Sequence, residues 1–141
     1  TMALSGTGSA GMEAGLSSLL EPDDTVVLCV CGFFGERMAD MAGRVGAKVV
    51  ALRSDWGRPF PAEMLDAELR KQPNVKLVAT IHAETSTGVR QPLEDLAALA
   101  KEHGALFMVD AVTNDELVRE APAIVGRETP SALAHAGGAA D

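Results

Sequence analysis

A single acidic residue, Asp110, interrupts an apolar stretch that runs from Leu106 to Thr113. Such a run, placed after a helix-ending glycine at Gly104, indicates a strand buried on both faces of a parallel sheet. An ionised carboxylate there is costly unless a positive group meets it, and open α/β sheets bind ligands at the carboxyl ends of their strands. Asp110 is therefore expected either to meet a cationic ligand or, more plainly, to cap the next helix or pair with an arginine.

Glycines and hydroxyl side chains alternate near the amino terminus, from Ser5 to Gly11. A helix is expected to follow directly, because Met12, Leu16, Leu19 and Leu20 recur on one helical face. Backbone N–H groups at a helix N-terminus bind phosphate readily. The spacing matches neither the P-loop nor the dinucleotide fingerprint, so the segment is either a phosphate-binding cradle or a flexible glycine loop.

Two further groups of side chains follow predicted strands. Phe33 and Phe34 are adjacent and cannot both face one core, so one of them is available to line a ligand site or to pack on a neighbouring loop. Hydroxyls and one acid make up the loop from Glu84 to Gly88. His82, just before that loop, is expected to be satisfied in the core rather than to line the site.

The elements that must position these residues alternate along the chain. Apolar, β-branched runs predict strands at 25–31, 48–53, 77–83 and 106–112, and helical spacing predicts helices after the cradle, after Phe34, at 61–71 and at 92–103. This alternation predicts a three-layer α/β/α domain with a mainly parallel sheet and right-handed crossovers. The cradle, Phe34, the hydroxyl loop and Asp110 should then share one edge of the sheet.

Composition limits the class of protein. A chain of 141 residues, 47% of them hydrophobic, suits one domain with a real core. Its formal charge of −8 disfavours nucleic acid and anionic membranes as partners. We expect a cytoplasmic protein, since no apolar stretch is long enough for a bilayer and the start lacks a secretory pattern. Cys29 and Cys31 are too close for a comfortable disulfide and form only a weak zinc motif, so reduced, buried thiols are expected.

Four segments together resemble the large domain of class V pyridoxal-phosphate aminotransferases, which are fold-type-I enzymes, and most closely the alanine–glyoxylate and serine–pyruvate branch. They are Ser5–Gly15, Cys31–Arg37, His82–Pro92 and Val109–Thr113. The resemblance runs from about Leu4 to Thr113 in the family's order and close to its spacing. It implies that residues 1–113 are part of a domain that binds pyridoxal 5'-phosphate.

The resemblance also assigns roles to particular residues. It implies that Thr7, Gly8 and Ser9 hold the cofactor phosphate, and that Thr85 hydrogen-bonds its phenolic oxygen. Phe34 and Val112 would pack on opposite faces of the ring. Asp110 would pair with the protonated pyridine nitrogen, which would be the positive partner that a buried carboxylate needs.

The implied activity is amino-group transfer between a small amino acid, alanine or serine, and a 2-oxo acid such as glyoxylate, in a homodimeric parent protein. The sequence departs from the family after Thr113. The family's cofactor-binding lysine lies beyond this strand, but the last lysine here is Lys101, and residues 114–141 read as a divergent tail, helical and then disordered. We therefore expect a fragment, cut at both ends and inactive in isolation. The alternative is a non-catalytic α/β module derived from that domain, which binds a ligand or a partner.

Overall fold

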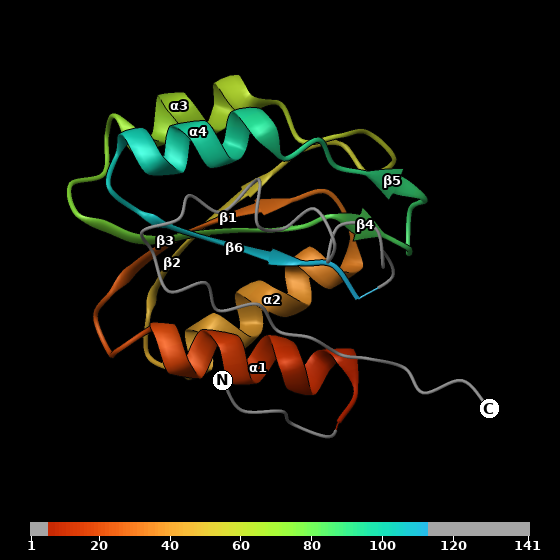
Figure 1. Ribbon diagram of the computed structural model, residues 1–141, viewed down its shortest axis with the longest axis horizontal. Helices are drawn as coiled ribbons and strands as arrows, with labels where there is room; N and C mark the ends of the chain where they lie inside the picture. The colour runs from red at the N-terminus through yellow and green to blue at the C-terminus, as the bar shows by residue number, and fades with distance from the viewer. Residues whose placement is uncertain (1–5, 113–141) are drawn as a thin grey trace.

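The computed structural model describes residues 6–112. Its main sheet has four strands in the order β2-β1-β3-β6, all pairing in parallel (Figure 1). The strands are β1 (Thr25–Val30), β2 (Lys48–Arg53), β3 (Val75–Ile81) and β6 (Leu106–Asp110). The expected α/β architecture with a mainly parallel sheet is confirmed. Residues 114–141, which the sequence marks as a divergent tail, lie outside the described residues.

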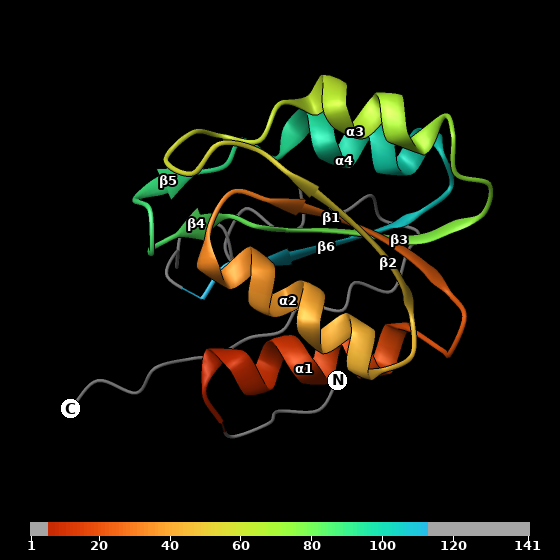
Figure 2. The same cartoon turned by 180° about the vertical axis from the view of Figure 1, so that it is seen from behind.

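Helices cover both faces of this sheet (Figures 1 and 2). One face carries α1 (Gly8–Leu19) and α2 (Phe33–Arg44), and the other carries α3 (Ala62–Leu69) and α4 (Glu94–Glu102). The central strand β1 shows why two layers are needed, because its side chains alternate between two apolar clusters. Val26 and Leu28 pack with α1 and α2, whereas Val27 and Cys29 pack with α3 and α4.

A short hairpin separates β3 from α4 and was not expected from the sequence. Its strands are β4 (Ala83–Glu84) and β5 (Val89–Arg90), which pair antiparallel. The predicted strand at 77–83 thus starts two residues earlier, at Val75, and ends at Ile81. The turn closes because the N–H groups of Thr87 and Gly88 donate to the carbonyl oxygen of Glu84, at 3.1 and 2.9 Å.

The helices are somewhat shorter than their predicted ranges. Pro61 stands at the N-cap of α3 in an extended conformation, so that helix begins at Ala62. Leu93 is the N-cap of α4, which begins two residues after Pro92. Cys29 and Cys31 are both buried free cysteines, as expected.

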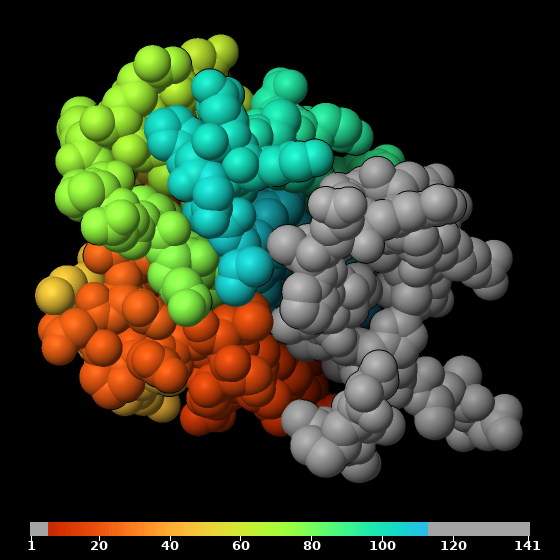
Figure 3. Space-filling model, turned by 60° about the vertical axis from the view of Figure 1, so that its left-hand side comes forward, coloured from red at the N-terminus to blue at the C-terminus, as the bar shows by residue number. Residues whose placement is uncertain are grey.

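The amino-terminal edge of the sheet is built from tight turns. Each of the four parallel strands follows a residue with positive φ. These residues are Asp23, Gly46, Asn74 and Gly104. Figure 3 shows several of the turns together on one face, with the α1–β1 connection in orange, the α3–β3 connection in green and the α4–β6 connection in cyan.

Candidate functional site

The opposite edge, at the carboxyl ends of the strands, holds a pocket of about 180 Å³. Its lining comes from the start of α1, the start of α2, the end of β3, the hairpin and the end of β6. It contains every residue that the sequence marked as a site residue: Thr7, Gly8, Ser9, Phe34, Thr85, Asp110 and Val112. Met12, Ile81 and Ala83 also line it, and the sequence gave no reason to place them there.

The glycine cradle forms one wall of the pocket, where α1 begins. Thr7 is the N-cap, and its Oγ1 accepts a hydrogen bond from the N–H of Ala10 at 3.4 Å. Gly8 and Ser9 are the first two helical residues, whose N–H groups have no partner within a helix. The first turn carries no acid that would neutralise the positive end of the helix dipole. This wall is suited to an anion.

Val112 packs directly over that cradle. A Cβ added to Gly8 would lie only 2.8 Å from Cγ2 of Val112. Glycine is thus needed at this position for space, because it lets the chain after β6 approach the first turn of α1. The contact brings the two ends of the described chain together at one pocket.

Asp110 is the last residue of β6 and lies half-buried in the pocket. Burial raises the pKa of its carboxyl group, and the charge of Glu84 raises it further, whereas a hydrogen bond from the N–H of Val112 opposes this. That N–H lies 3.1 Å from Oδ1 of Asp110. Among residues 6–112 no basic side chain forms an ion pair with Asp110. The arginine partner considered above is therefore not found in the described part of the chain, and a cation could be accommodated here.

The two adjacent phenylalanines have different surroundings. Phe34 is half-buried, packs against the α1/α2 cluster and also lines the pocket. Phe33 is 51% exposed, with its ring edge-on to that of Phe34 at a centroid distance of 5.5 Å. Phe34 thus contributes to both the core and the pocket, while Phe33 is exposed and lines neither.

His82 is buried and satisfied, as the sequence suggested. Its Nδ1 lies 3.0 Å from the carbonyl oxygen of Gln91, and its backbone N–H donates to the carbonyl oxygen of Asp110 at 2.9 Å. Burial lowers the pKa of its imidazole. His82 therefore helps to fix the end of β6 through its backbone.

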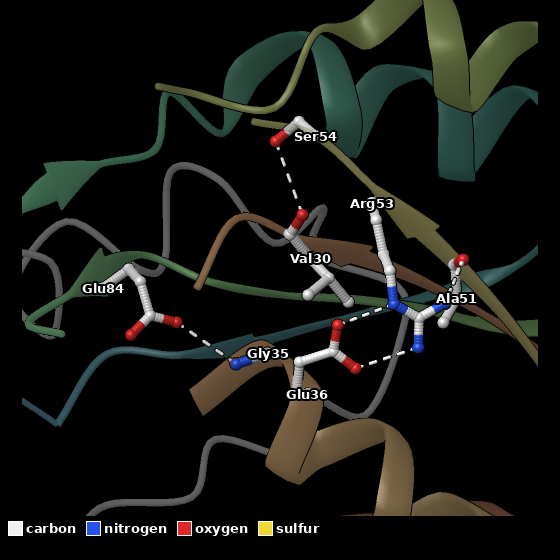
Figure 4. A network of polar contacts seen from close by, with 7 residues as sticks. All are labelled: Val30, Gly35, Glu36, Ala51, Arg53, Ser54 and Glu84. Carbon is white, nitrogen blue, oxygen red and sulfur yellow. Dashed lines mark hydrogen bonds and ion pairs between the residues drawn. The ribbon is translucent and has the colours of Figure 1, made fainter. Parts of the chain in front are cut away.

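Glu84 is a residue whose importance the sequence did not reveal. It is completely buried, and its carboxylate accepts hydrogen bonds from the N–H groups of Phe34 and Gly35, at 3.1 and 3.2 Å. Figure 4 shows this carboxylate directed at the start of α2. No local pattern marks it, because β4 has only two residues and shows no periodicity.

Other kinds of site are not supported within the described ranges. No group of three or more His, Cys, Asp or Glu side chains there could hold a metal ion. No helix in residues 6–112 has the length and apolar character to cross a membrane.

Comparison with known proteins decides the family. The family model described as "Aminotransferase class-V" matches residues 2–115. The chain belongs to the class V aminotransferase family. The resemblance inferred from the sequence motifs is thereby confirmed.

Individual members of this family are similar to the chain in both sequence and structure. The (S)-ureidoglycine–glyoxylate transaminase of Bacillus subtilis strain 168 is 41% identical over 109 residues, which are 77% of this chain and 26% of the relative. The 2-aminoethylphosphonate–pyruvate transaminase of Salmonella typhimurium is 37% identical over 112 residues, or 79% of this chain and 30% of the relative. The crystal structure of alanine–glyoxylate aminotransferase from Nostoc sp. superposes with a TM-score of 0.75 and 47% identity, covering 80% of this chain and 30% of that one.

The matched part of this class V chain corresponds to a limited share of these aminotransferases. It spans about 26% to 30% of their length. The fold and pocket described here are thus the counterpart of one portion of a larger enzyme.

Proposed function

We propose that this chain supplies part of the cofactor site of a class V aminotransferase, with pyridoxal 5'-phosphate as the cofactor. The reaction would move an amino group between a small amino acid, alanine or serine, and a 2-oxo acid such as glyoxylate. Class V aminotransferases are generally dependent on this cofactor. The similar proteins named above are called glyoxylate or pyruvate aminotransferases, which favours a small 2-oxo acid.

One observation carries the proposal. The pocket has a helix N-terminus at Gly8 and Ser9, whose first turn carries no acid, and a half-buried acid, Asp110, without a basic partner in the described chain. A ligand that combines a phosphate with a cationic ring would satisfy both groups at once. The chemistry of this pair of sites fits pyridoxal phosphate.

The remaining lining residues fit the same ligand. Thr7, Gly8 and Ser9 would hold the phosphate, and Thr85 would donate to the phenolic oxygen. The rings and methyl groups of Phe34 and Val112 would enclose the pyridine from its two faces. When bound, the cofactor supplies an electron sink for the electron pair left after an amino acid loses its Cα proton.

Asp110 would keep a proton on the pyridine nitrogen. An ionised carboxylate favours the charged form of a neighbouring cation, and more strongly where burial excludes water. Conversely, the cation would favour the ionised form of Asp110, which burial alone disfavours. This mutual dependence makes Asp110 the residue that selects for a protonated ring.

We also propose that the isolated chain lacks aminotransferase activity. Its lysines, at positions 48, 71, 76 and 101, are absent from the pocket lining. Lys48 and Lys71 pair with Asp23 and Glu68 at the surface. Residues 1–113 would act as part of a pyridoxal-phosphate domain, in a cytoplasmic homodimer that contains the rest of the enzyme. The second candidate, a non-catalytic ligand-binding module, rests on the same pocket.

The direct test is a binding measurement with the 141-residue chain. Equilibrium dialysis should show that pyridoxal phosphate binds more tightly than inorganic phosphate. Asp110→Ala should weaken pyridoxal phosphate binding about tenfold or more, because the cationic ring loses its buried counter-charge. Asp66→Ala, which removes a surface acid paired with Arg70 on α3, is the control and should leave binding unchanged. Equal affinity for both ligands, or no effect of Asp110→Ala, would count against the proposal.

Labelling and turnover test the predicted inactivity of this chain, and turnover by a longer protein separates the two candidates. Borohydride reduction of the chain with pyridoxal phosphate should label no single lysine in full, and alanine or serine with glyoxylate should give no turnover. If a longer protein that contains this chain shows turnover, the aminotransferase part is supported. If no longer form exists and the pocket still binds the cofactor, the ligand-binding module is the better description.

A further inference from the structure

Glu84 is the only buried carboxylate among residues 6–112. Four donors point at it, and an ionised carboxylate is a pure acceptor that can take them all. The N–H groups of Phe34 and Gly35 lie 3.1 and 3.2 Å from Oε2, while Oγ of Ser86 lies 2.5 Å and its N–H 3.4 Å from Oε1. A charge this well satisfied can be buried without a basic partner.

These contacts join two elements that are distant in the sequence. The N-cap of α2, Gly32, has no side chain, so the first N–H groups of that helix need partners from elsewhere. The hairpin turn supplies them: Ser86 Oγ accepts from the N–H of Phe33 at 3.0 Å, and Glu84 accepts from the next two residues. The negative carboxylate also lies at the positive end of the α2 dipole. Figure 4 shows the bond between Glu84 and Gly35.

The Glu84 side chain occupies the space that a side chain at position 32 would need. A Cβ at position 32 would lie 2.3 Å from Cγ and 2.5 Å from Cδ of Glu84. The φ of Gly32 is 177°, which is ordinary extended backbone, so the need for glycine is one of space. The pairing of a glycine with a buried glutamate therefore specifies how closely the hairpin approaches the helix.

Both joined elements carry a pocket residue next to the contact. The backbone N–H of Phe34 donates a hydrogen bond to the Glu84 carboxylate, and Thr85 is the next residue after Glu84 in the chain. We infer that Glu84 is a positioning residue of the pocket, whose buried carboxylate holds the backbone of Phe34 and the turn that bears Thr85 in a fixed relation. This inference rests on the proposed function for the identity of the ring that these two residues contact.

The phosphate wall is independent of this contact. Thr7, Gly8 and Ser9 belong to α1, and Glu84 has no hydrogen bond to them. Loss of the Glu84 contacts should therefore affect binding of the ring and spare binding of phosphate. A merely structural role would weaken both ligands alike, through partial unfolding.

The first experiment compares wild type with Glu84→Gln in the 141-residue chain. Amide hydrogen exchange followed by NMR should be faster at Phe34 and Gly35 by about tenfold. The reason is that the NH2 group of glutamine is itself a donor and cannot accept a hydrogen bond from a backbone N–H group. Equilibrium dialysis should show about tenfold weaker binding of pyridoxal phosphate and unchanged binding of inorganic phosphate. Gln91→Leu is the control, because it removes buried hydrogen bonds to Phe60 outside the pocket lining. It should lower stability without this selective loss.

A second variant reaches the same contact from the other side. Gly32→Ala should displace the Glu84 side chain and reproduce both the faster exchange and the selective loss of ring binding. In a Glu84→Ala background, the added methyl group at position 32 meets no Cγ or Cδ and is crowded only by Oγ of Ser86, at 2.8 Å, so it should cost less further stability than it does in wild type. This pair of variants decides the matter even if Glu84→Gln folds poorly.

Three results would overturn the inference: wild-type exchange rates at Phe34 and Gly35 in both variants, unchanged affinity for pyridoxal phosphate, or equal weakening of both ligands. The proposed function fails separately, if the wild-type chain prefers inorganic phosphate or binds neither ligand. In that case the exchange rates alone decide whether Glu84 holds the start of α2.

Discussion

The two edges of the parallel sheet are built in different ways. At the amino-terminal edge, each strand follows a residue in the left-handed region, among them Gly46 and Gly104. At the carboxyl-terminal edge, the end of β6 and the segment between β3 and α4 bring together a half-buried acid, Asp110, and a buried one, Glu84. The first edge depends on backbone conformation, and the second depends on side chains.

This difference separates stability from binding. A left-handed glycine stabilises a turn because other residues pay a steric cost there. A half-buried carboxylate without a basic partner does the opposite, since it costs stability until a ligand meets it. Substitutions at the amino-terminal edge should thus change stability alone, whereas removal of the Asp110 charge should change stability and binding in opposite directions.

The largest effect on stability is expected at Gly104. Its φ is 70° and nothing lies within 4 Å of an added Cβ, so Gly104→Ala tests backbone conformation without crowding. We expect a loss of about 1–2 kcal/mol in the free energy of unfolding, measured by urea denaturation. Affinity for pyridoxal phosphate should not change.

A matched glycine gives the opposite sign. Gly43 lies near the end of α2, is exposed, and also has open space around its Cβ position. Gly43→Ala should raise stability by a few tenths to about 1 kcal/mol, because alanine favours the helical conformation. If both alanines had the same effect, the turn conformation at Gly104 would not be what matters.

A smaller effect, of opposite sign to that at Gly104, is expected at Asp110. Its pKa in the folded chain is raised above the ordinary value, mainly by burial, so the folded chain holds this proton more tightly than the unfolded chain. Stability therefore falls as pH rises through the interval from the ordinary pKa to the raised one, and the cost persists above it. Asp110→Asn should stabilise the empty protein at neutral pH, with the gain vanishing below the ordinary pKa of aspartate.

The same variant should bind pyridoxal phosphate less tightly, because the neutral amide cannot balance a cationic ring. Thermal unfolding with and without the ligand, at pH 3 and pH 7, measures both effects. A destabilised Asp110→Asn at pH 7 would show that the ionised acid is already balanced in the empty pocket.

The sequence predicted much of this arrangement, for identifiable reasons. Uninterrupted apolar runs of a parallel sheet located all four long strands, and the glycine cradle, Phe34, Thr85 and Asp110 were placed at one edge by topology alone. The order of the strands could not be predicted from the sequence, because β1 and β3 are similar apolar runs and either of them could have occupied the centre of the sheet.

The hairpin and Glu84 were missed for a related reason. Strands of two residues leave no periodic pattern, so the loop from Glu84 to Gly88 indicated only a turn. The burial of Glu84 depends on the N–H groups of Phe34 and Gly35, which lie about 50 residues away in the sequence. No local signal reports such a partner.

The smallest effect is expected where the carboxyl-terminal edge lies away from the pocket. Arg53, at the end of β2, donates two hydrogen bonds to Glu36 in the first turn of α2, at 2.6 and 2.9 Å (Figure 4). The hydrogen bond from Arg53 lowers the pKa of Glu36, so the pair contributes stability above the ordinary pKa of glutamate and loses it as pH falls through the lowered one.

Arg53→Ala should cost at most about 1 kcal/mol at pH 7, because the pair is exposed to solvent, and less in high salt. Binding of pyridoxal phosphate should remain unchanged, since neither residue lines the pocket. Arg44→Ala, which breaks the exposed ion pair with Asp40 on the outer face of α2, is the control for removing an arginine. A clear loss of ligand affinity in Arg53→Ala alone would mean that the start of α2 is held from the β2 side as well as by Glu84. Side-chain contacts would then determine binding along the whole carboxyl-terminal edge.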